Sequence, residues 1–469
     1  MSFFHELGLS DPILRALDSK GYDTPTPIQK DAIPALMQGR DLLGIAQTGT
    51  GKTAAFSLPS LHHLAKETKG RTHKGVRMLV LSPTRELAAQ IAENIREYAR
   101  FLNLSVNCIF GGVPIFQQKK KLAPGTDVLV ATPGRLLDLI EQRAVTLENV
   151  EIFVLDEADQ MMDLGFIVPL KRIASMLPKN RQSLFFSATM PKAIAELGAR
   201  FLNNPVRVEV APQATTAERV EQYVTFVSQS EKQALLTLKL QEIRPERTLV
   251  FTRTKHGADK VVRALAGAGI RSAAIHGNKS QGQRTAALKA FKDNEIKVLI
   301  ATDIAARGID ITGVSHVFNY DLPNVAEQYV HRIGRTARNG ADGIAIAFVS
   351  GDERGLLKDI ERLTKVKPVP MPLPKGFSEA AAQLPPPVKA PVNSGGGRGG
   401  ERGSGDRSGP GGRNYGPKRD GDRRRAGGGG RPGGGGGRSG GGGRSGGGGG
   451  GGARVGGVGA HKDSVKRIG

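Results

Sequence analysis

The stretch DLLGIAQTGTGKTAAFSLPSLHHLA, residues 41 to 65, determines how the first part of the chain folds. It starts as a short apolar strand, passes through a loop of glycine and threonine, and continues as a helix-like segment. Gly49 and Gly51 would let backbone N–H groups approach phosphate oxygens, and the start of the helix would add a favourable dipole. Lys52 would then reach the β- and γ-phosphates of a nucleotide, and Thr53 would ligate magnesium. The pattern predicts a phosphate loop in an α/β domain.

The loop departs from the strict phosphate-loop pattern at its first position, where Ala46 replaces glycine. On this pattern alone, a Gly-rich structural turn is the alternative. A second motif, FVLDEAD at residues 153 to 159, ends an apolar run with three carboxylates. Asp156 would hold magnesium and Glu157 would polarise the attacking water, because ligands of α/β sheets bind at the carboxyl ends of the strands. A solvated acidic turn is the weaker interpretation once a phosphate loop is present.

Short apolar runs alternate with helix-like segments twice along the chain. Most runs are rich in Val, Ile and Leu without polar alternation, which is typical of parallel strands covered on both faces. The expected strands are residues 41–46, 76–82, 106–110, 127–131, 152–155 and 183–187, then 222–227, 247–252, 271–276, 298–302, 316–320 and 344–350. The clearest helical segments are 85–101, 257–268, 282–293 and 325–333.

This alternation predicts two α/β domains joined by a linker. The pattern lapses from residue 203 to 217, where Pro205, Pro212 and polar residues occur, and the prolines at 368 to 374 end the second domain. The expected boundaries are a first domain at 1–208, a linker at 209–218, a second domain at 219–370 and a tail at 371–469.

Charge and glycine are concentrated in the tail. The 469-residue chain has 67 Lys plus Arg, 44 Asp plus Glu and a formal net charge of +23. Residues 380 to 469 alone contain 36 of its 63 glycines, and their 17 basic and 5 acidic residues give a net +12. Because this tail has almost no large apolar residue, it is expected to be disordered. Its dispersed Arg-Gly units suit multivalent phosphate contact, with a plain solubilising linker as the alternative.

Other classes of protein are disfavoured by the sequence. No apolar run approaches the roughly 18 residues of a membrane span, and acidic Glu6 and Asp11 stand where a signal peptide would be basic and then apolar. The single Cys108 permits no internal disulfide and fits a reducing compartment, so we expect a cytoplasmic location away from membranes. The excess of positive charge indicates a polyanionic partner.

Taken together, the motifs resemble those of DEAD-box ATP-dependent RNA helicases of superfamily 2. The short N-terminal lead and the Gly/Arg tail are most similar to the bacterial RhlE-type members. The resemblance implies two RecA-like parallel-sheet domains in tandem, followed by a disordered Arg/Gly-rich tail. It rests, beside the phosphate loop and DEAD, on GYDTPTPIQ (21–29), SPTREL (82–87), a glycine pair (111–112), TPGR (132–135), SAT (187–189), VFTRT (250–254), QGQR (281–284), ATDIAARGID (301–310) and HRIGRTAR (331–338). The family also has Ala at the position of Ala46, which removes that objection.

The resemblance implies ATP and Mg²⁺ as cofactors and assigns roles to individual residues. The nucleotide-binding residues are Phe4, Tyr22, Gln29, Thr48, Gly49, Thr50, Gly51, Lys52, Thr53, Asp156, Gly308 and Asp310, of which Thr53 and Asp156 hold the metal. The catalytic residues are Glu157, His331 and the arginine fingers Arg335 and Arg338, while Arg332 is interpreted as structural. The residues that contact the RNA backbone are Thr84, Arg85, Gly112, Thr132, Arg135, Arg284 and Thr302. Ser187 and Thr189 couple ATP hydrolysis to unwinding.

The implied function is local, ATP-dependent separation of short RNA duplexes or remodelling of RNA–protein complexes, with sequence-independent RNA contacts. Two alternatives stay open: an RNA annealing or clamping protein in which ATP regulates residence time, and a DNA translocase on the same two-domain core. The physiological RNA, the oligomeric state and any ribosome-assembly or RNA-decay complex are not determined by the sequence. The run Lys119 to Lys121 is interpreted as a solvated helix face.

Overall fold

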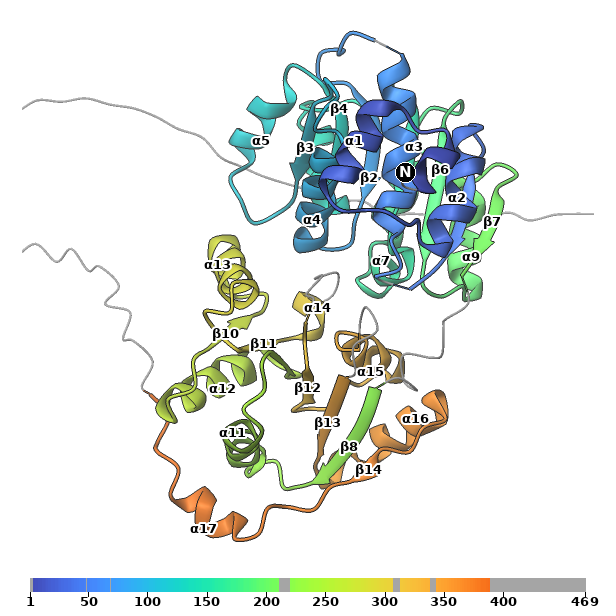
Figure 1. Ribbon diagram of the computed structural model, residues 1–469. Coiled ribbons are helices and arrows are strands. Elements are labelled where there is room, and N and C mark those ends of the chain that lie inside the picture. The colour runs from blue at the N-terminus through green and yellow to red at the C-terminus, as the bar shows by residue number, and fades with distance from the viewer. Residues whose placement is uncertain are drawn as a thin grey trace, which may run out of the picture. The chain divides into compact units, whose positions relative to one another are not determined.

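The structure is a computed structural model that describes residues 3–47, 49–67, 69–210, 220–306, 313–337 and 343–388. The described residues contain two parallel sheets, each with helices on both faces (Figure 1). The prediction of disorder for residues 389–469 lies outside the described residues. No helix among the described residues has both the length and the apolar character that crossing a bilayer would require.

The first sheet has seven strands in the order β3-β4-β2-β5-β6-β1-β7, and every pairing within it is parallel. Six of them confirm the strands expected from the sequence, and no end of these strands is shifted by more than one residue. The strands are β1 (Leu42–Ile45), β2 (Val76–Leu81), β3 (Val106–Ile109), β4 (Thr126–Ala131), β5 (Ile152–Leu155), β6 (Gln182–Ser187) and β7 (Val206–Glu209).

Strand β7 lies inside the stretch from 203 to 217 where the alternating pattern lapses. Val206–Glu209 pairs with β1 along its whole length, and of the linker expected at 209–218 only Glu209 belongs to this strand. Arg207 and Glu209 are exposed and Val208 is buried, so this edge strand alternates instead of showing the all-apolar pattern of the central strands.

Helices cover the first sheet from both sides because successive strand residues point to opposite faces. On one face Val80 and Val154 pack with helices α1 to α4, and on the other Leu79, Leu155 and Phe185 pack with α6, α8 and α9. The helices of this half are η1 (Phe3–Leu7), α1 (Asp11–Ser19), α2 (Pro27–Met37), α3 (Lys52–Lys66), α4 (Arg85–Tyr98), α5 (Ile115–Leu122), α6 (Pro133–Glu141), α7 (Ala158–Asp163), α8 (Ile167–Ala174) and α9 (Lys192–Phe201).

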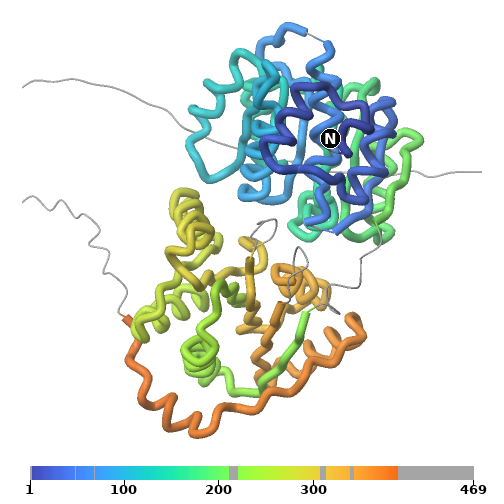
Figure 2. The backbone as a smooth tube through the Cα atoms, viewed as in Figure 1, coloured from blue at the N-terminus to red at the C-terminus, as the bar shows by residue number. Residues whose placement is uncertain are grey.

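The second sheet repeats the design, with seven parallel strands in the order β10-β11-β9-β12-β13-β8-β14. Its strands are β8 (Val220–Phe226), β9 (Thr248–Phe251), β10 (Ser272–Ile275), β11 (Val298–Ala301), β12 (His316–Asn319), β13 (Gly343–Val349) and β14 (Val369–Pro370). The tube in Figure 2 follows the helices that flank it: α11 (Lys232–Ile243), α12 (Lys255–Gly267), α13 (Gln281–Lys292), α14 (Asp303–Ala306), α15 (Ala326–Ile333), η2 (Gly351–Glu353), α16 (Arg354–Thr364) and α17 (Phe377–Ala382).

The second half extends beyond its expected end at residue 370. Strand β14 adds to the sheet beside β8, and α17 packs against α11 with Phe377 buried in the core. The expected tail boundary at 371 is therefore too early. The prolines at 368 to 374 were expected to end the second domain. A proline is nevertheless tolerated in β14, because this strand lies at the edge of the sheet.

Three neighbouring strands of the first sheet position the motifs. In the order β5-β6-β1, Leu155 is level with Phe185, and Ile45 is level with Ser187. The phosphate loop follows β1, DEAD follows β5 and SAT begins at the end of β6. Because carboxyl ends of parallel strands share one edge, these three motifs meet there.

Candidate functional site

The phosphate loop begins where β1 ends and finishes at the first residue of α3. The Ala46 amide donates to the Ser187 carbonyl at 3.0 Å, which ties the start of the loop to β6. Gly51 lies before α3 with φ of +95°, and a Cβ there would lie 2.5 Å from Gln29 Nε2 and 2.8 Å from Thr26 Oγ1. Only glycine fits this position, both for its backbone conformation and for the space left by α2.

Lys52 and Asp156 face each other in the interior of the site. Lys52 Nζ lies 3.9 Å from Asp156 Oδ1, and both side chains are at least 95 % buried. Neither of these two atoms has a hydrogen-bond partner among the described residues. Burial raises the pKa of the Asp156 carboxyl to about 7, against the lowering effect of the Lys52 ammonium. Such a buried, under-satisfied pair fits a site for phosphate and a hard cation.

Glu157 is held by an unusual backbone conformation. It precedes α7 with φ of +54° and ψ of 54°, in the left-handed region that non-glycine residues rarely adopt, and its side chain is buried. Strain of this kind is found where the surrounding structure fixes a functional group. The result is a carboxylate held next to Asp156 at the edge of the sheet.

A cavity of about 670 Å³ opens beside these residues. It is lined by Gly49, Gly51, Lys52, Thr53, Asp156 and Glu157 and, from the segment before α2 and from α2 itself, by Tyr22 and Gln29. Thr50 fixes the loop, since its hydroxyl donates to the Gln47 carbonyl at 2.8 Å. The structure therefore gathers most of the nucleotide-binding residues expected in this half around one space large enough for a small-molecule ligand.

Gln29 joins the residues before α2 to the phosphate loop. Its Oε1 accepts from the Thr26 amide at 3.0 Å, and its Nε2 donates to the Gly51 carbonyl at 3.1 Å. An amide oxygen has a second lone pair and an amide nitrogen a second hydrogen, so one acceptor and one donor are still available for a ligand. Tyr22 packs against Tyr98 with ring centroids 6.3 Å apart. Phe4 is 1 % exposed in the core and is not among the residues that line the cavity.

Asp159 connects DEAD to SAT, a role that the sequence analysis did not assign. Its Oδ2 accepts from the amides of Ala188 and Thr189, both at 3.1 Å, and from the Thr189 hydroxyl at 3.2 Å. Ser187 is fully buried at the end of β6. The sequence shows Asp159 only as the third carboxylate of DEAD. Its contact with SAT becomes visible once β5 and β6 are seen to be neighbours.

Residues expected to contact RNA in the first half come together around the glycine pair. Thr84 caps α4, with its hydroxyl accepting from the Leu87 amide at 3.3 Å. The Arg85 guanidinium lies against Gly112, where a Cβ would come 2.0 Å from Nη1. Arg135 Nη1 donates to the Val113 carbonyl at 3.1 Å, and Thr132 precedes the first turn of α6. Two guanidinium groups and two helix starts thus surround residues 111 to 113.

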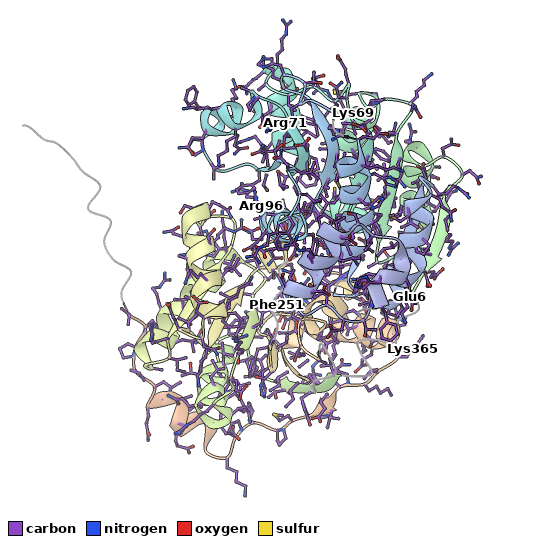
Figure 3. All side chains as sticks on the ribbon, turned by 45° about the horizontal axis from the view of Figure 1, so that its top comes forward. Glu6, Lys69, Arg71, Arg96, Phe251 and Lys365 are labelled. Atoms are coloured by element: carbon purple, nitrogen blue, oxygen red, sulfur yellow. The ribbon has the colours of Figure 1, made fainter. Side chains whose placement is uncertain are left out.

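The second half places its motifs at the carboxyl edge of its own sheet. Thr302 directly follows β11. His331, Arg335 and Phe251 line a small cavity, and Phe251 is labelled in Figure 3. Arg284 lies on α13 and its Nη2 donates to Glu86 Oε2 at 2.7 Å. Four candidate site residues predicted from the sequence lie outside the described residues: Thr48, Gly308, Asp310 and Arg338.

Arg332, which was interpreted as structural, forms hydrogen bonds with three other residues of the second half. It donates to Asp303 from Nε at 2.5 Å and from Nη2 at 2.7 Å, and from Nη1 to Asn319 Oδ1 and the Asp321 carbonyl. Its guanidinium also lies 5.0 Å from the centre of the Phe251 ring. This bidentate pair joins Asp303, next to Thr302, to Arg332, next to His331.

Two family models match the chain. The model for DEAD/DEAH box helicases covers residues 26–197, and the model for the helicase conserved C-terminal domain covers residues 230–340. The chain belongs to the DEAD-box helicases. The first region contains β1 to β6 and the second contains β9 to β12, so each sheet belongs to one of the two units of a helicase core.

Relatives and solved structures agree with this membership. The chain is 42 % identical to ATP-dependent RNA helicase CshA of Listeria monocytogenes serovar 1/2a, over 82 % of this chain and 73 % of the relative. It is 41 % identical to the CshA of Limosilactobacillus reuteri, over 79 % and 74 %. S. cerevisiae Dbp5 bound to RNA and ADP BeF3 is 30 % identical and covers 81 % of this chain and 100 % of its own, with a TM-score of 0.69. The expected fold of two tandem RecA-like domains is confirmed.

Proposed function

We propose that this protein is an ATP-dependent RNA helicase that separates short RNA duplexes locally and couples this to RNA-stimulated ATP hydrolysis. One observation carries the proposal: Lys52, Asp156 and Glu157 converge beside SAT at the ends of three adjacent strands. Membership of the DEAD-box helicases makes the chain an enzyme that hydrolyses ATP. The two bacterial relatives are named ATP-dependent RNA helicases, and the yeast Dbp5 structure holds RNA.

In this proposal, ATP occupies the 670 Å³ cavity with its phosphates at the loop. The Lys52 ammonium would meet the β- and γ-phosphates, and Tyr22 and Gln29 would hold the adenine. Thr53 and Asp156 would hold Mg²⁺, since a hydroxyl and a buried carboxylate whose Oδ1 has no hydrogen-bond partner among the described residues suit a hard cation. When bound, the metal would neutralise charge that develops on the phosphates.

Glu157 would orient and polarise the water that attacks the γ-phosphate. The second half would contribute Arg335 and Arg338 as arginine fingers, with His331 connecting them to the DEAD carboxylates. A finger contributes about 10³ to 10⁵ in rate, so hydrolysis would be slow until ATP and RNA bring the two halves together. Gly308 and Asp310 would meet the ribose.

RNA would lie along the residues that surround Gly112 and continue onto Arg284 and Thr302. Backbone N–H groups, threonines and guanidinium groups suit phosphate and 2′-hydroxyl contact, which does not depend on base sequence. Coupling would pass through SAT: Asp159 binds the backbone of residues 188 and 189, so a shift of the DEAD segment would move Thr189 as well.

Strand separation distinguishes helicase from annealing protein. A short labelled RNA duplex is incubated with the protein and ATP, ADP or a non-hydrolysable ATP analogue. A helicase separates the strands with ATP and turns over, whereas an annealing or clamping protein accelerates pairing and uses ATP only to change its residence time. Comparing ATPase stimulation by RNA and by DNA of the same sequence tests the third alternative, the DNA translocase.

Gln29 predicts discrimination against GTP. Adenine offers a donor at N6 and an acceptor at N7, which match the free acceptor and donor of the amide, while guanine offers two acceptors. We expect GTP to be hydrolysed about 5- to 150-fold less efficiently than ATP, since one mismatched bond costs about 1 to 3 kcal/mol. Steady-state rates with both nucleotides measure this. Gln29→Ala should weaken ATP binding, and equal use of GTP and ATP by the unaltered protein would disprove the assignment.

The tail is predicted to raise RNA affinity without contributing to catalysis. Its 17 Lys plus Arg are spread over a Gly-rich sequence, and every motif for ATP lies before residue 339. Truncation after residue 388, which keeps α17 and its buried Phe377, should leave the RNA-saturated ATPase rate nearly unchanged. It should raise the RNA concentration required and flatten the salt dependence, because each neutralised phosphate on single strands contributes about −0.7 to the logarithmic slope.

RNA affinity across a salt series for both proteins measures this contribution. Equal slopes and equal affinities would reduce the tail to a spacer, and a large fall in saturated turnover would mean that it acts on the core. The cytoplasmic location, the RhlE-type assignment and a place in ribosome-assembly or RNA-decay complexes stay predictions. The bacterial relatives reported above carry the name CshA.

A further inference from the structure

Helix α5 presents an aromatic and two cations on one exposed face. It begins three residues after Gly112, and its buried side is fixed by Leu122 and by Gln118, whose Nε2 donates to the Phe110 carbonyl at 3.1 Å. On the opposite side Phe116 is 74 % exposed, which makes it the most exposed large apolar residue among those described. Lys119 follows it by three residues and Lys120 by four, so both lysines lie on the same side of the helix as Phe116.

The charge around this face is positive and uncompensated. The sequence from Arg100 to Thr126 contains no Asp or Glu. Within the described part of the chain, no carboxylate pairs with Lys119, Lys120 or Lys121. Arg96, labelled in Figure 3, extends the charge onto α4, where its Nη2 donates to the Val106 carbonyl at 3.3 Å on the edge strand β3. The exposed ring of Phe116 therefore lies in a positively charged surrounding.

We propose that the face formed by Phe116, Lys119 and Lys120 binds RNA that extends beyond the segment held by the core motifs. An exposed aromatic ring next to flexible cations is the combination that binds single strands, with a base stacked on the ring and phosphates near the ammonium groups. The face is continuous with the residues around Gly112, because Arg135 holds the Val113 carbonyl just before the helix begins. The partner is therefore RNA, and an acidic protein segment is an outcome that the test would reveal.

This inference rests on the proposed function, since it needs RNA to lie at residues 111 to 113. The binding proposed for α5 differs from that of the core contacts in one measurable property, the dependence of affinity on RNA length. The core contacts act on every RNA, whereas α5 acts only on RNA long enough to leave the core. Affinity for a long strand should thus depend on α5, and affinity for a short one should not.

The test uses the full chain and two oligouridylates, one just long enough to saturate the ATPase of the unaltered protein and one extended at both ends. Phe116→Ala should weaken binding of the extended strand about 5- to 100-fold, the range for loss of stacking on one base. Lys119→Gln with Lys120→Gln should reduce the logarithmic salt slope on that strand by about 0.7 to 1.4. Binding of the short strand and the RNA-saturated ATPase rate should not change.

Matched variants separate this role from fold or general charge. Phe116→Trp should restore binding, because indole also stacks, and Lys171→Gln with Lys179→Gln removes two exposed charges of the same half elsewhere and should have no effect. Unchanged affinity of the α5 variants for the extended strand overturns the inference, as does an equal loss on both strands. Loss of binding to an acidic peptide with RNA binding intact would assign the face to a protein. If the unaltered protein bound no RNA, the proposed function itself would fail.

Discussion

Replacing Lys52 by alanine is expected to abolish ATP turnover, with a loss of at least about 10²-fold, the usual cost of removing one preorganised electrostatic group from a reacting site. The Lys52 ammonium is the cation nearest to Asp156, at 3.9 Å in a buried site. Its removal takes away the charge that would meet the phosphates. It also takes away the charge that opposes the burial-driven rise in the pKa of Asp156, so this pKa should rise further.

The measurement is steady-state phosphate release with saturating RNA, together with ATP affinity from a fluorescent nucleotide. Lys66→Ala is the matched control, because it removes the same charge from the exposed last turn of the same helix. That control should hydrolyse ATP like the unaltered protein. Near-normal turnover of the Lys52 variant would remove the phosphate loop from the site, while equal loss in both variants would indicate damage to α3.

The central strands and the meeting of the motifs could be predicted from the sequence. Continuous Val/Ile/Leu runs such as residues 152 to 155 have no solvent-facing side, so their pattern indicates parallel strands directly. Once β1, β5 and β6 are recognised as parallel neighbours, the positions after Ile45, Leu155 and Ser187 must share one edge. Lys52 and Asp156 face each other for this reason.

One edge of each sheet, formed by β7 and by β14, could not be predicted in the same way. Strand β7 has the sequence VRVE, whose alternation and neighbouring proline are as typical of a connection as of an edge strand. Strand β14 is two residues long and contains Pro370, and α17 is a six-residue helix fixed by Phe377. Elements this short are stabilised by tertiary packing, which leaves little periodic signal in the sequence.

The motifs located the site residues but did not show which of them contact each other. Asp159 accepts hydrogen bonds from backbone amides of SAT, and Gln29 is bonded to the Gly51 carbonyl. A backbone group carries no side-chain signature, so the sequence gives no sign of these bonds. The pair of Asp303 and Arg332 joins two motifs that are each visible in the sequence, but their contact depends on how β11 and α15 are placed.

Replacing Glu157 by glutamine is expected to keep ATP and RNA binding while blocking hydrolysis. Glutamine has the same size and can occupy the same buried position, but it can neither accept a proton nor polarise water as a carboxylate does. We expect a fall in turnover of about 10²- to 10⁴-fold, the usual contribution of a positioned acid or base. The dissociation constants for ATP and for RNA should stay within a few-fold of those of the unaltered protein.

The Lys52→Ala and Glu157→Gln variants are expected to differ in ATP and RNA binding. The Lys52 variant should lose nucleotide binding and turnover together, whereas the Glu157 variant should bind ATP and RNA jointly and release RNA slowly, because the step that reopens the complex no longer occurs. Single-turnover hydrolysis and the rate of RNA dissociation with ATP present measure this. Glu141→Gln makes the same chemical change at an exposed carboxylate paired with Arg172, where surface pairs contribute about 0 to 1 kcal/mol, and should leave both rates unchanged. Fast hydrolysis by the Glu157 variant would assign the attacking water to another group, and loss of ATP binding would mean that Glu157 supports the site and not the reaction.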